Sequence, residues 1–394
     1  CHSTGFEAGY LAKQNTGGEA SGAMVDGDTW HSRWREMAVG CESCHGPAAG
    51  HVADYASSSE RKKQSDTIAA YGEPFAQAAG SALSLAKAPH FQFSPHAPIA
   101  AASETAVAQV QQMNVCGRCH SLRQPLRTGD GADIVNAAHY LDVFELTPVQ
   151  EPLYYADGQI REEVFVAGSF LQSKMHAAGV TCTHCHDAHS GSVEGFDDTS
   201  PATLSNDQSC LQCHRAATYA VAAHHHHPVG SEAARCVSCH MPETTYMGVD
   251  PRRDHRFSVP DPYAAQQLST PDVCTDCHSD RSLAWAISAL AGWRDQPRRV
   301  TLAEDVSAAE SGSAKALVRL FEAVQSPSTP VMQRAMVIDR IPLRSQPIFS
   351  ALVAWLNDDD ALVRRAAIER LADIEPAPRV PLLGSMLDDE VKAV

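Results

Sequence analysis

Residues 182–214 read CTHCHDAHSGSVEGFDDTSPATLSNDQSCLQCH, and they contain one five-residue pattern twice, at 182–186 and at 210–214. In this pattern two cysteines are separated by two residues, and a histidine follows the second cysteine directly. Four more copies lie at 41–45, 116–120, 236–240 and 274–278. All six cysteine pairs of the chain therefore end in histidine, although only 20 of the 394 residues are histidines. Chance does not produce this arrangement, so one chemical requirement must underlie all six copies.

Covalent attachment of haem explains the pattern. The two thiols add across the two vinyl groups of the porphyrin, and the adjacent imidazole reaches the iron from the same short turn. A structural zinc site would need cysteine pairs that close on each other in tetrahedral sets, without a histidine at a set next position. A thioredoxin-like dithiol would occur once, near a βαβ pattern. A disulfide framework suits a small secreted chain, whereas this chain is long and its spacing is uniform.

The motifs define the expected haem-binding residues. Cys1-His2 fits the end of a seventh motif, although a free cysteine that happens to precede a histidine is the alternative. The cysteines expected to form thioethers are Cys1, Cys41, Cys44, Cys116, Cys119, Cys182, Cys185, Cys210, Cys213, Cys236, Cys239, Cys274 and Cys277. The histidines expected on the proximal side of each iron are His2, His45, His120, His186, His214, His240 and His278. About seven haem c groups with their irons are therefore expected.

The remaining thirteen histidines are enough to give each iron a second imidazole. Two imidazoles close the iron coordination, which suits electron transfer. The favoured distal candidates are His51, His176, His189, His226 and His255. The other candidates are His31, His90, His96, His139, His224, His225 and His227. His184 lies between the two thiols of its own motif and is expected not to bind iron. Methionine ligation stays open for one site, through Met37, Met113, Met175, Met241 or Met247.

Composition narrows the functional class. The formal net charge of −16 argues against nucleic acid as a partner, because phosphates would be repelled, and it favours cationic redox proteins or plain solubility. No run of about 18 apolar residues occurs, so no membrane span is predicted. Both ends look cut, and an export signal upstream and further sequence downstream are expected.

The predicted fold is mainly α. Residues 1–293 are expected to form a multihaem cytochrome domain with little regular secondary structure, because about 40 residues per haem leave too few side chains for an ordinary core. Residues 46–115 and 121–181 are the two long intervals between motifs, and either could shield haems or line a substrate pocket, with plain packing favoured. The alternating stretch IREEVFV at 160–166 could form a short strand.

After residue 278 the chain has no further Cys or His, and its character changes. A connecting helix is expected at 281–293, a polar linker at 294–312, and helical hairpins over 313–394. Leu352, Trp355 and Leu356 would form one apolar stripe, and the stretch 363–371 the next. The segments WLNDDDALVRRA (355–366) and SMLDDEVKAV (385–394) resemble each other at a spacing near 30 residues. This repeat indicates a HEAT-like α-solenoid that is truncated at its C-terminal end. An ordinary helical bundle is the alternative.

Three stretches carry a resemblance to a known family: CESCHGPAAGHV (41–52), GSFLQSKMHAAGVTCTHCHDAHSG (168–191) and HHHHPVGSEAARCVSCHMPETTYMGVDPRRDH (224–255). They look like bacterial multihaem c-type cytochromes with C-terminal HEAT-like repeats, in the broad superfamily of cytochrome c nitrite reductase. The resemblance covers most of residues 1–280. It implies a periplasmic or extracellular location, covalent haem c, closely stacked haem pairs and largely bis-histidine irons. It also implies a helical surface that docks redox proteins or supports homo- or hetero-assembly.

The catalytic relatives in that superfamily differ from this chain. Pentahaem nitrite reductases use a CxxCK motif, and no such motif occurs here. Octahaem hydroxylamine-type enzymes need one more haem than this chain shows. Tyr246, Arg252, Arg253 and His255 form a polar group that could serve a substrate, but haem-propionate binding explains it equally well.

Three functions are therefore compatible with the sequence. The favoured one is an electron conduit through about seven haems, which is not an enzyme in itself. The second is a reductase of a small nitrogen or sulfur oxyanion at one five-coordinate iron. The third is a subunit of an extracellular cytochrome filament or larger assembly.

Overall fold

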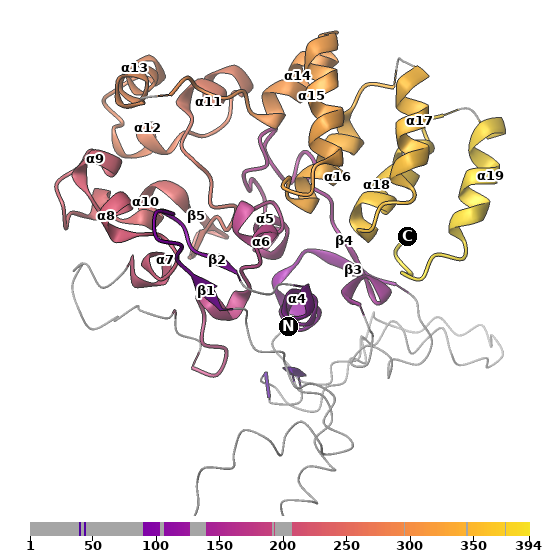
Figure 1. The fold of residues 1–394 in the computed structure, drawn as a ribbon, viewed down its shortest axis with the longest axis horizontal. Helices are drawn as coiled ribbons and strands as arrows, with labels where there is room; N and C mark the ends of the chain where they lie inside the picture. Colours follow the sequence, from indigo (N-terminus) through magenta and orange to yellow (C-terminus); the bar gives the residue numbers. More distant parts are fainter. Residues whose placement is uncertain are drawn as a thin grey trace, which may run out of the picture.

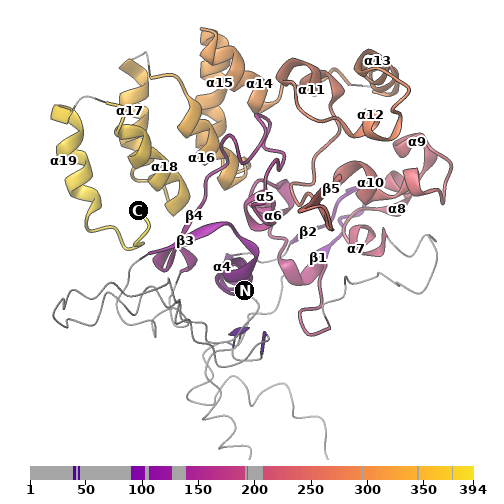
Figure 2. The same ribbon diagram turned by 180° about the vertical axis from the view of Figure 1, so that it is seen from behind.

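A computed structural model of the chain describes residues 39–40, 43–44, 90–102, 106–126, 139–190, 193, 207–294, 296–343, 346–374 and 376–394. The described chain is mainly helical, as expected, and its sheets are small. Helices α14 to α19 stand side by side above the segment that carries α4, β3 and β4, and the motif-bearing short helices lie to one side of them (Figure 1). The same arrangement is seen from behind in Figure 2.

Short helices dominate the part of the chain that carries the CxxCH motifs, as the motif spacing predicts. The bounds are α4 (Ala106–His120), η5 (Tyr140–Asp142), α5 (Ala167–Phe170), α6 (Lys174–Ala177), η6 (Cys182–His184), α7 (Gln208–Leu211), α8 (Ala216–Tyr219), α9 (Ala222–His225), η8 (Glu232–Ala234), α10 (Cys236–His240), α11 (Pro262–Leu268), α12 (Val273–Cys277) and α13 (Leu283–Trp293). Asp272 caps α12 by accepting a hydrogen bond from the backbone N–H of Thr275, at 3.0 Å, so the helix begins just before its cysteine pair.

Three two-stranded antiparallel sheets occur among the described residues. Their strands are β1 (Phe91–Gln92) with β2 (Ala101–Ala102), β3 (Arg123–Pro125) with β4 (Phe144–Leu146), and β5 (Glu243–Tyr246) with β6 (Asp250–Arg253). The strand considered for 160–166 is not formed. That stretch makes only isolated bridges, Tyr154 with Ile160 and Ser121 with Phe165, because no neighbouring strand continues the ladder.

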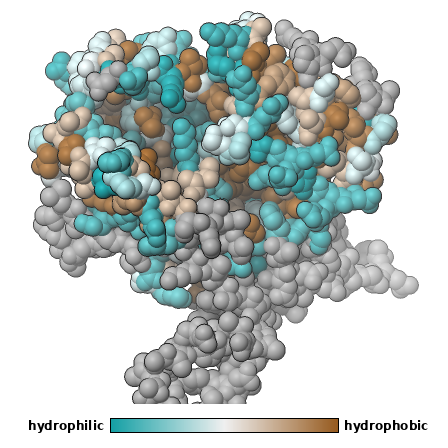
Figure 3. Space-filling view, in the orientation of Figure 1, coloured by the Kyte–Doolittle hydropathy of each residue, from teal (hydrophilic) through white to brown (hydrophobic). Residues whose placement is uncertain are grey.

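The C-terminal helices are α14 (Leu302–Glu310), α15 (Ala314–Gln325), α16 (Val331–Arg340), α17 (Gln346–Trp355), α18 (Ala361–Leu371) and α19 (Pro376–Met386). They confirm the predicted helical segments after residue 313. The two apolar stripes expected from the sequence are buried in one core, with Leu352 and Leu371 fully buried. On the outer face, hydrophilic residues predominate and hydrophobic ones form small groups (Figure 3).

The segment 294–312 requires a correction, because it contains α14 and is not only a linker. Thr301 and Glu304 form a capping box, in which each side chain bonds the backbone N–H of the other residue. Ala303, Val306 and Ala309 are buried, and Val306 and Ala309 belong to the core of the C-terminal helices. The polar character of the stretch hid an apolar face with helical spacing.

The C-terminal helices share a core with residues 140–171. Leu141 and Phe144 pack in one apolar cluster with Met332 and Met336 of α16. Buried Arg365 of α18 donates a hydrogen bond to the carbonyl oxygen of Leu146 at 2.8 Å. The insert that precedes the CTHCH motif therefore packs against the C-terminal helices. Helices α14–α19 are called the helical array below.

Asp339 on α16 provides a pH-dependent test of this array. Burial raises the pKa of its carboxyl group to about 6, with a further contribution from the charge of Glu369. At neutral pH the folded protein holds a carboxylate that its surroundings disfavour. As the pH falls through 6 the folded state binds a proton that the unfolded state still lacks, so the free energy of unfolding contributed by this group rises.

We expect Asp339→Asn to stabilise the protein at pH 7.5 by on the order of 1–3 kcal/mol, and to have little effect near pH 4. Thermal unfolding of both proteins at the two pH values measures this difference. An equal effect of the substitution at both pH values would contradict the assignment.

Candidate functional site

Each complete CxxCH motif in the described residues is wound into about one helical turn. The backbone N–H of His186 donates to the carbonyl oxygen of Cys182 at 3.0 Å, and His278 bonds Cys274 in the same way at 2.9 Å. Residues three apart in a helical turn lie on the same face. The two thiols of a motif therefore project to one side, with the imidazole beside them, as attachment to a single planar ring requires.

Thiols of different motifs also approach one another. Cys116 and Cys182 lie within hydrogen-bonding reach, and this contact raises the pKa of the Cys116 thiol and lowers that of the Cys182 thiol. Cys210 and Cys236 form a second pair of the same kind, in which the pKa of Cys236 is raised. In a c-type cytochrome these sulfur atoms are thioethers and carry no proton, so what the contacts report is proximity. The second and third motifs are neighbours, and so are the fourth and fifth.

Three pairs of imidazoles face each other at nearly identical spacing. The ring centroids of His186 and His255 are 6.2 Å apart with an interplanar angle of 20°. The corresponding pairs are His224 with His240, at 6.2 Å and 13°, and His227 with His278, at 6.1 Å and 23°. In every pair one member is the histidine of a CxxCH motif and the other comes from the set of spare histidines.

This spacing fits one metal ion between two imidazoles. A histidine nitrogen binds a transition metal at about 2.0 Å, and a ring nitrogen lies about 1.1 Å from the ring centroid, so two ligands in line across one ion have centroids about 6.2 Å apart. All three pairs lie within 0.1 Å of this value, so each could hold one metal ion between its two rings.

Hydrogen bonds to the other ring nitrogen orient these imidazoles. The Nδ1 atom of His255 lies 2.9 Å from the carbonyl oxygen of Arg253, and Nδ1 of His240 lies 2.8 Å from that of Ser258. Nδ1 of His227 lies 2.5 Å from the carbonyl oxygen of His225. A carbonyl oxygen only accepts, so Nδ1 carries the hydrogen and Nε2 keeps its lone pair for a metal.

Burial keeps several of these rings in the neutral form that a metal ligand needs. Burial lowers the pKa of His255, with the backbone bond to Arg253 acting in the opposite direction. Burial also lowers the pKa of His224, and the nearby His240 adds to this effect. Such rings hold no competing proton at neutral pH.

The backbone conformation of the run His224–His227 directs two of its rings toward the histidines of two different motifs. Helix α9 ends at His225, and His226 adopts the left-handed conformation, with φ of 56°. This residue turns the chain, so that His224 faces His240 while His227 faces His278. The ring of Tyr219 stands edge-to-face against both His214, at 5.3 Å, and His224, at 5.2 Å.

The other spare histidines make different contacts. His226 stacks on Trp293 with ring centroids 4.0 Å apart, and the side chain of His189 is 88% exposed beside Asp187. Burial lowers the pKa of His176 to about 4, and its ring packs edge-to-face on Phe170. His139 caps η5 by accepting the N–H of Leu141. The remaining spare histidines in the described ranges are exposed His90 and His96, His184, whose Nδ1 bonds Thr181, and His225.

Several predicted site residues lie outside the described residues. They are Cys1, His2, His31, Cys41, His45 and His51. Cys44 is described and half-buried, as are the cysteines of the five later motifs apart from Cys277, which is exposed.

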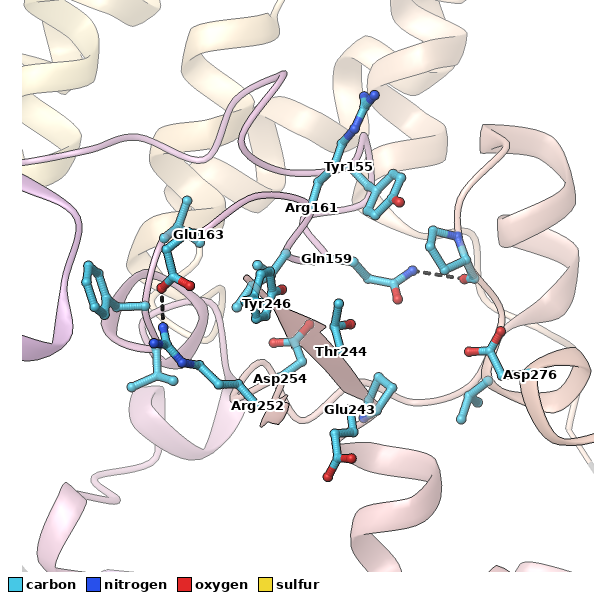
Figure 4. A pocket seen from close by; sticks show the side chains of 17 residues that line it. Tyr155, Gln159, Arg161, Glu163, Glu243, Thr244, Tyr246, Arg252, Asp254 and Asp276 are labelled. Atoms are coloured by element: carbon cyan, nitrogen blue, oxygen red, sulfur yellow. Dashed lines mark hydrogen bonds and ion pairs between the residues drawn. The ribbon is translucent and has the colours of Figure 1, made fainter. Parts of the chain in front are cut away.

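A pocket lies beside the motifs, between residues 155–166, the β5–β6 hairpin and residues 271–276. Arg252 and Glu163 face each other at one side of it and Asp276 lies on the opposite side (Figure 4). Arg252 also bonds Asp250 at 2.8 Å, and burial raises the pKa of Tyr246 to about 12. The pocket thus carries mixed charge, and its main arginine is already paired with two carboxylates.

Phe165, in the wall of this pocket, has a left-handed backbone with φ of 61°, which is strained for an aromatic residue. The next residue, Val166, donates its N–H to the carbonyl oxygen of His120 at 3.2 Å. Burial lowers the pKa of His120, and the charge of Arg252 lowers it further. The pocket therefore adjoins the second motif.

Within the described residues, no three Cys, His, Asp or Glu side chains converge in a group that could hold a metal ion by themselves. No helix in the described part combines the length and the apolar character needed to cross a membrane.

No protein-family model matches the chain, and no curated protein is significantly similar to it. Among solved structures, the chain is similar to the outer cell wall cytochrome OcwA, with 14% sequence identity and a TM-score of 0.35 over 86% of this chain and 71% of that one.

Proposed function

We propose that the chain is an electron-transfer protein that holds about seven haem c groups through its CxxCH motifs, with most irons bound by two histidines. The observation that carries the proposal is the set of three imidazole pairs at 6.1–6.2 Å. We assign His186 with His255, His240 with His224, and His278 with His227 as axial ligand pairs.

The residues of the chain prepare a closed coordination sphere. Bound haem iron supplies reversible one-electron oxidation and reduction. Carbonyl groups hold the Nδ1 hydrogens of His227, His240 and His255, so each ring presents Nε2 in a preset direction. Two histidines held in this way would remain the ligands of an iron in both of its charge states, so little rearrangement of the chain would accompany electron transfer.

Contacts between motifs support a spatial order that follows the chain. The thiol contacts link the second motif to the third and the fourth to the fifth. The side chain of Gln212 in the fourth motif donates to the carbonyl oxygen of His184 in the third at 2.6 Å. Burial raises the pKa of Cys239 in the fifth motif, and the nearby Cys277 of the sixth motif raises it further. We propose a path from Cys116 to Cys277 in sequence order.

Mass spectrometry and visible spectroscopy of the purified protein test the proposal. We expect one covalently bound haem for every intact motif, and absorption and magnetic spectra dominated by six-coordinate low-spin iron. Zinc on the cysteines, or peptides of the motif regions without an added tetrapyrrole, would refute the haem assignment itself.

The location and the partners follow from the same proposal. We propose a periplasmic or extracellular protein, because haem c is attached outside the cytoplasm, and redox proteins as its electron donor and acceptor. The C-terminal helices, proposed as a HEAT-like α-solenoid, use one side to pack on residues 140–171. A docking or assembly surface would therefore have to lie on a face that these contacts leave open.

A reductase is the second candidate, and one observation favours it. The pocket carries Arg252, a cation that an oxyanion could approach, and it adjoins His120, whose pKa is lowered by burial and further by the charge of Arg252. The carboxylates of Glu163 and Asp250 offset the charge of Arg252, which weakens its attraction for an oxyanion. A high-spin iron in the intact protein that binds nitrite or sulfite would support this candidate, and spectra in which every iron is low-spin would exclude it.

A further inference from the structure

Helix α13 contacts one member of an imidazole pair, His278, and the residue that precedes the other member, His227. Near its N-terminal end the ring of Trp285 lies 4.9 Å from the ring of His278. At its C-terminal end Trp293 stacks on His226, with centroids 4.0 Å apart and an interplanar angle of 11°. His226 directly precedes His227, which faces His278 at 6.1 Å. One helix thus touches the motif histidine and the turn that carries its partner.

The two ends of α13 are held to the imidazole pair in different ways. The start of α13 is tied to the sixth motif by the chain itself, because Ser282 caps the helix four residues after His278 and accepts the N–H of Trp285 at 3.3 Å. The turn His224–His227 has no such covalent link to α13. Its attachment to the helix at this end is the face-to-face stack of His226 on Trp293.

The backbone at His226 explains why this stack matters. Its left-handed conformation is unfavourable for a residue with a Cβ atom, and it is also what directs His227 away from His224. Neighbouring contacts must maintain such a conformation if it is to persist. Trp293 provides one across its indole face, while it remains 42% exposed on its other side.

We propose that Trp293 is a positioning residue which, through His226, holds His227 on the iron of the haem attached at Cys274 and Cys277. This inference rests on the proposed function and goes beyond it, because it assigns the stability of one ligand pair to an aromatic contact outside the coordination sphere. Helix α13 then constrains the pair at two points, with Trp285 against His278 and Trp293 against His226, the residue that precedes His227.

The test uses the full-length haem-loaded protein and measures how fast carbon monoxide binds to the reduced irons. Carbon monoxide reaches a bis-histidine iron only after one histidine leaves, so the rate reports the fraction of time that His227 is off the iron. His227→Ala identifies the kinetic phase that belongs to this haem. For Trp293→Leu we expect that phase to accelerate about twofold to tenfold, as loss of an aromatic stack would give, with the other phases unchanged.

Two further variants make the result specific. Trp293→Phe retains an aromatic face and is expected to bind carbon monoxide at close to the wild-type rate. His226→Ala removes the other partner and is expected to accelerate the same phase as Trp293→Leu. A redox titration of Trp293→Leu and of His226→Ala is expected to show a shifted midpoint for one haem, and that of Trp293→Phe the wild-type midpoint, while haem content and thermal stability of all three stay near those of the wild type.

The outcomes separate the inference from the proposed function. If haem is attached at Cys274 and Cys277 but neither Trp293→Leu nor His226→Ala changes the rate of that phase, the positioning role is overturned and bis-histidine ligation stands. If the sixth motif carries no haem, or if His227→Ala alters no phase and no spectrum, the proposed ligand pair itself fails.

Discussion

Replacement of His255 by alanine is expected to convert one haem from low spin to high spin and to leave the others unchanged. Burial lowers the pKa of His255, and its ring faces His186 with centroids 6.2 Å apart. Alanine removes the second nitrogen ligand, and a weakly bound water cannot maintain the low-spin state. The high-spin signal should amount to about one haem in seven, measured by electron paramagnetic resonance and magnetic circular dichroism.

The same change at His224 and at His227 should each affect one haem, and the three effects should add, because the three ligand pairs are separate. His189→Ala is the matched control, since this residue lies beside the third motif with its side chain 88% exposed. If His255→Ala kept a low-spin spectrum and His189→Ala gained a high-spin signal, then His189 and not His255 would be the second ligand of the iron that His186 binds.

The motif region shows how far sequence reasoning reaches. The regular CxxCH spacing specifies the thiols and the motif histidine, because both requirements are local to one helical turn. The partner histidine is set by packing between distant segments. His255 lies 69 positions after His186 in the sequence and still faces it. Separation along the chain therefore carries little information about which spare histidine meets which motif.

The run His224–His227 illustrates the same limit at short range. Four identical residues do not show which side chain points toward which motif, and His226 was predicted as a ligand ahead of its neighbours. In the structure His224 and His227 face motif histidines, and His226 stacks on Trp293 instead. The left-handed conformation at His226 makes this difference, and a non-glycine residue in that conformation is not foreseeable from the sequence.

The C-terminal helices are easier to predict from the sequence, because helical periodicity is a local property. The periodicity predicts helical hairpins over 313–394, and helices lie there in the structure. Helix α14 could have been found from the Thr301–Glu304 capping box. Nothing in the sequence indicated that these helices pack on residues 140–171. That contact joins segments about 200 residues apart, and side-chain complementarity over such a distance has no periodic signature.

Arg365→Met is expected to weaken the attachment of the helical array to the haem-bearing part. Arg365 is 7% exposed, and its guanidinium donates to the carbonyl oxygen of Leu146 and to the carboxylates of Glu145 and Glu369. Methionine fills a similar volume but leaves the Leu146 carbonyl without its donor in a buried interface. We expect a loss of about 2–4 kcal/mol in the free energy of unfolding.

The distinctive consequence is a loss of cooperativity between the two parts of the fold. In the wild type, helical circular dichroism and haem absorption should change together on heating, because the shared core of residues 140–171 and α16 links them. In Arg365→Met the two signals should separate, with the helical array melting first. Arg370→Met on the same helix is the control, since Arg370 bonds Ile341 and Asp373 within the array and its loss leaves the shared core intact. If Arg370→Met separates the transitions and Arg365→Met does not, then the array is joined to the haem-bearing part by contacts other than those around Leu146.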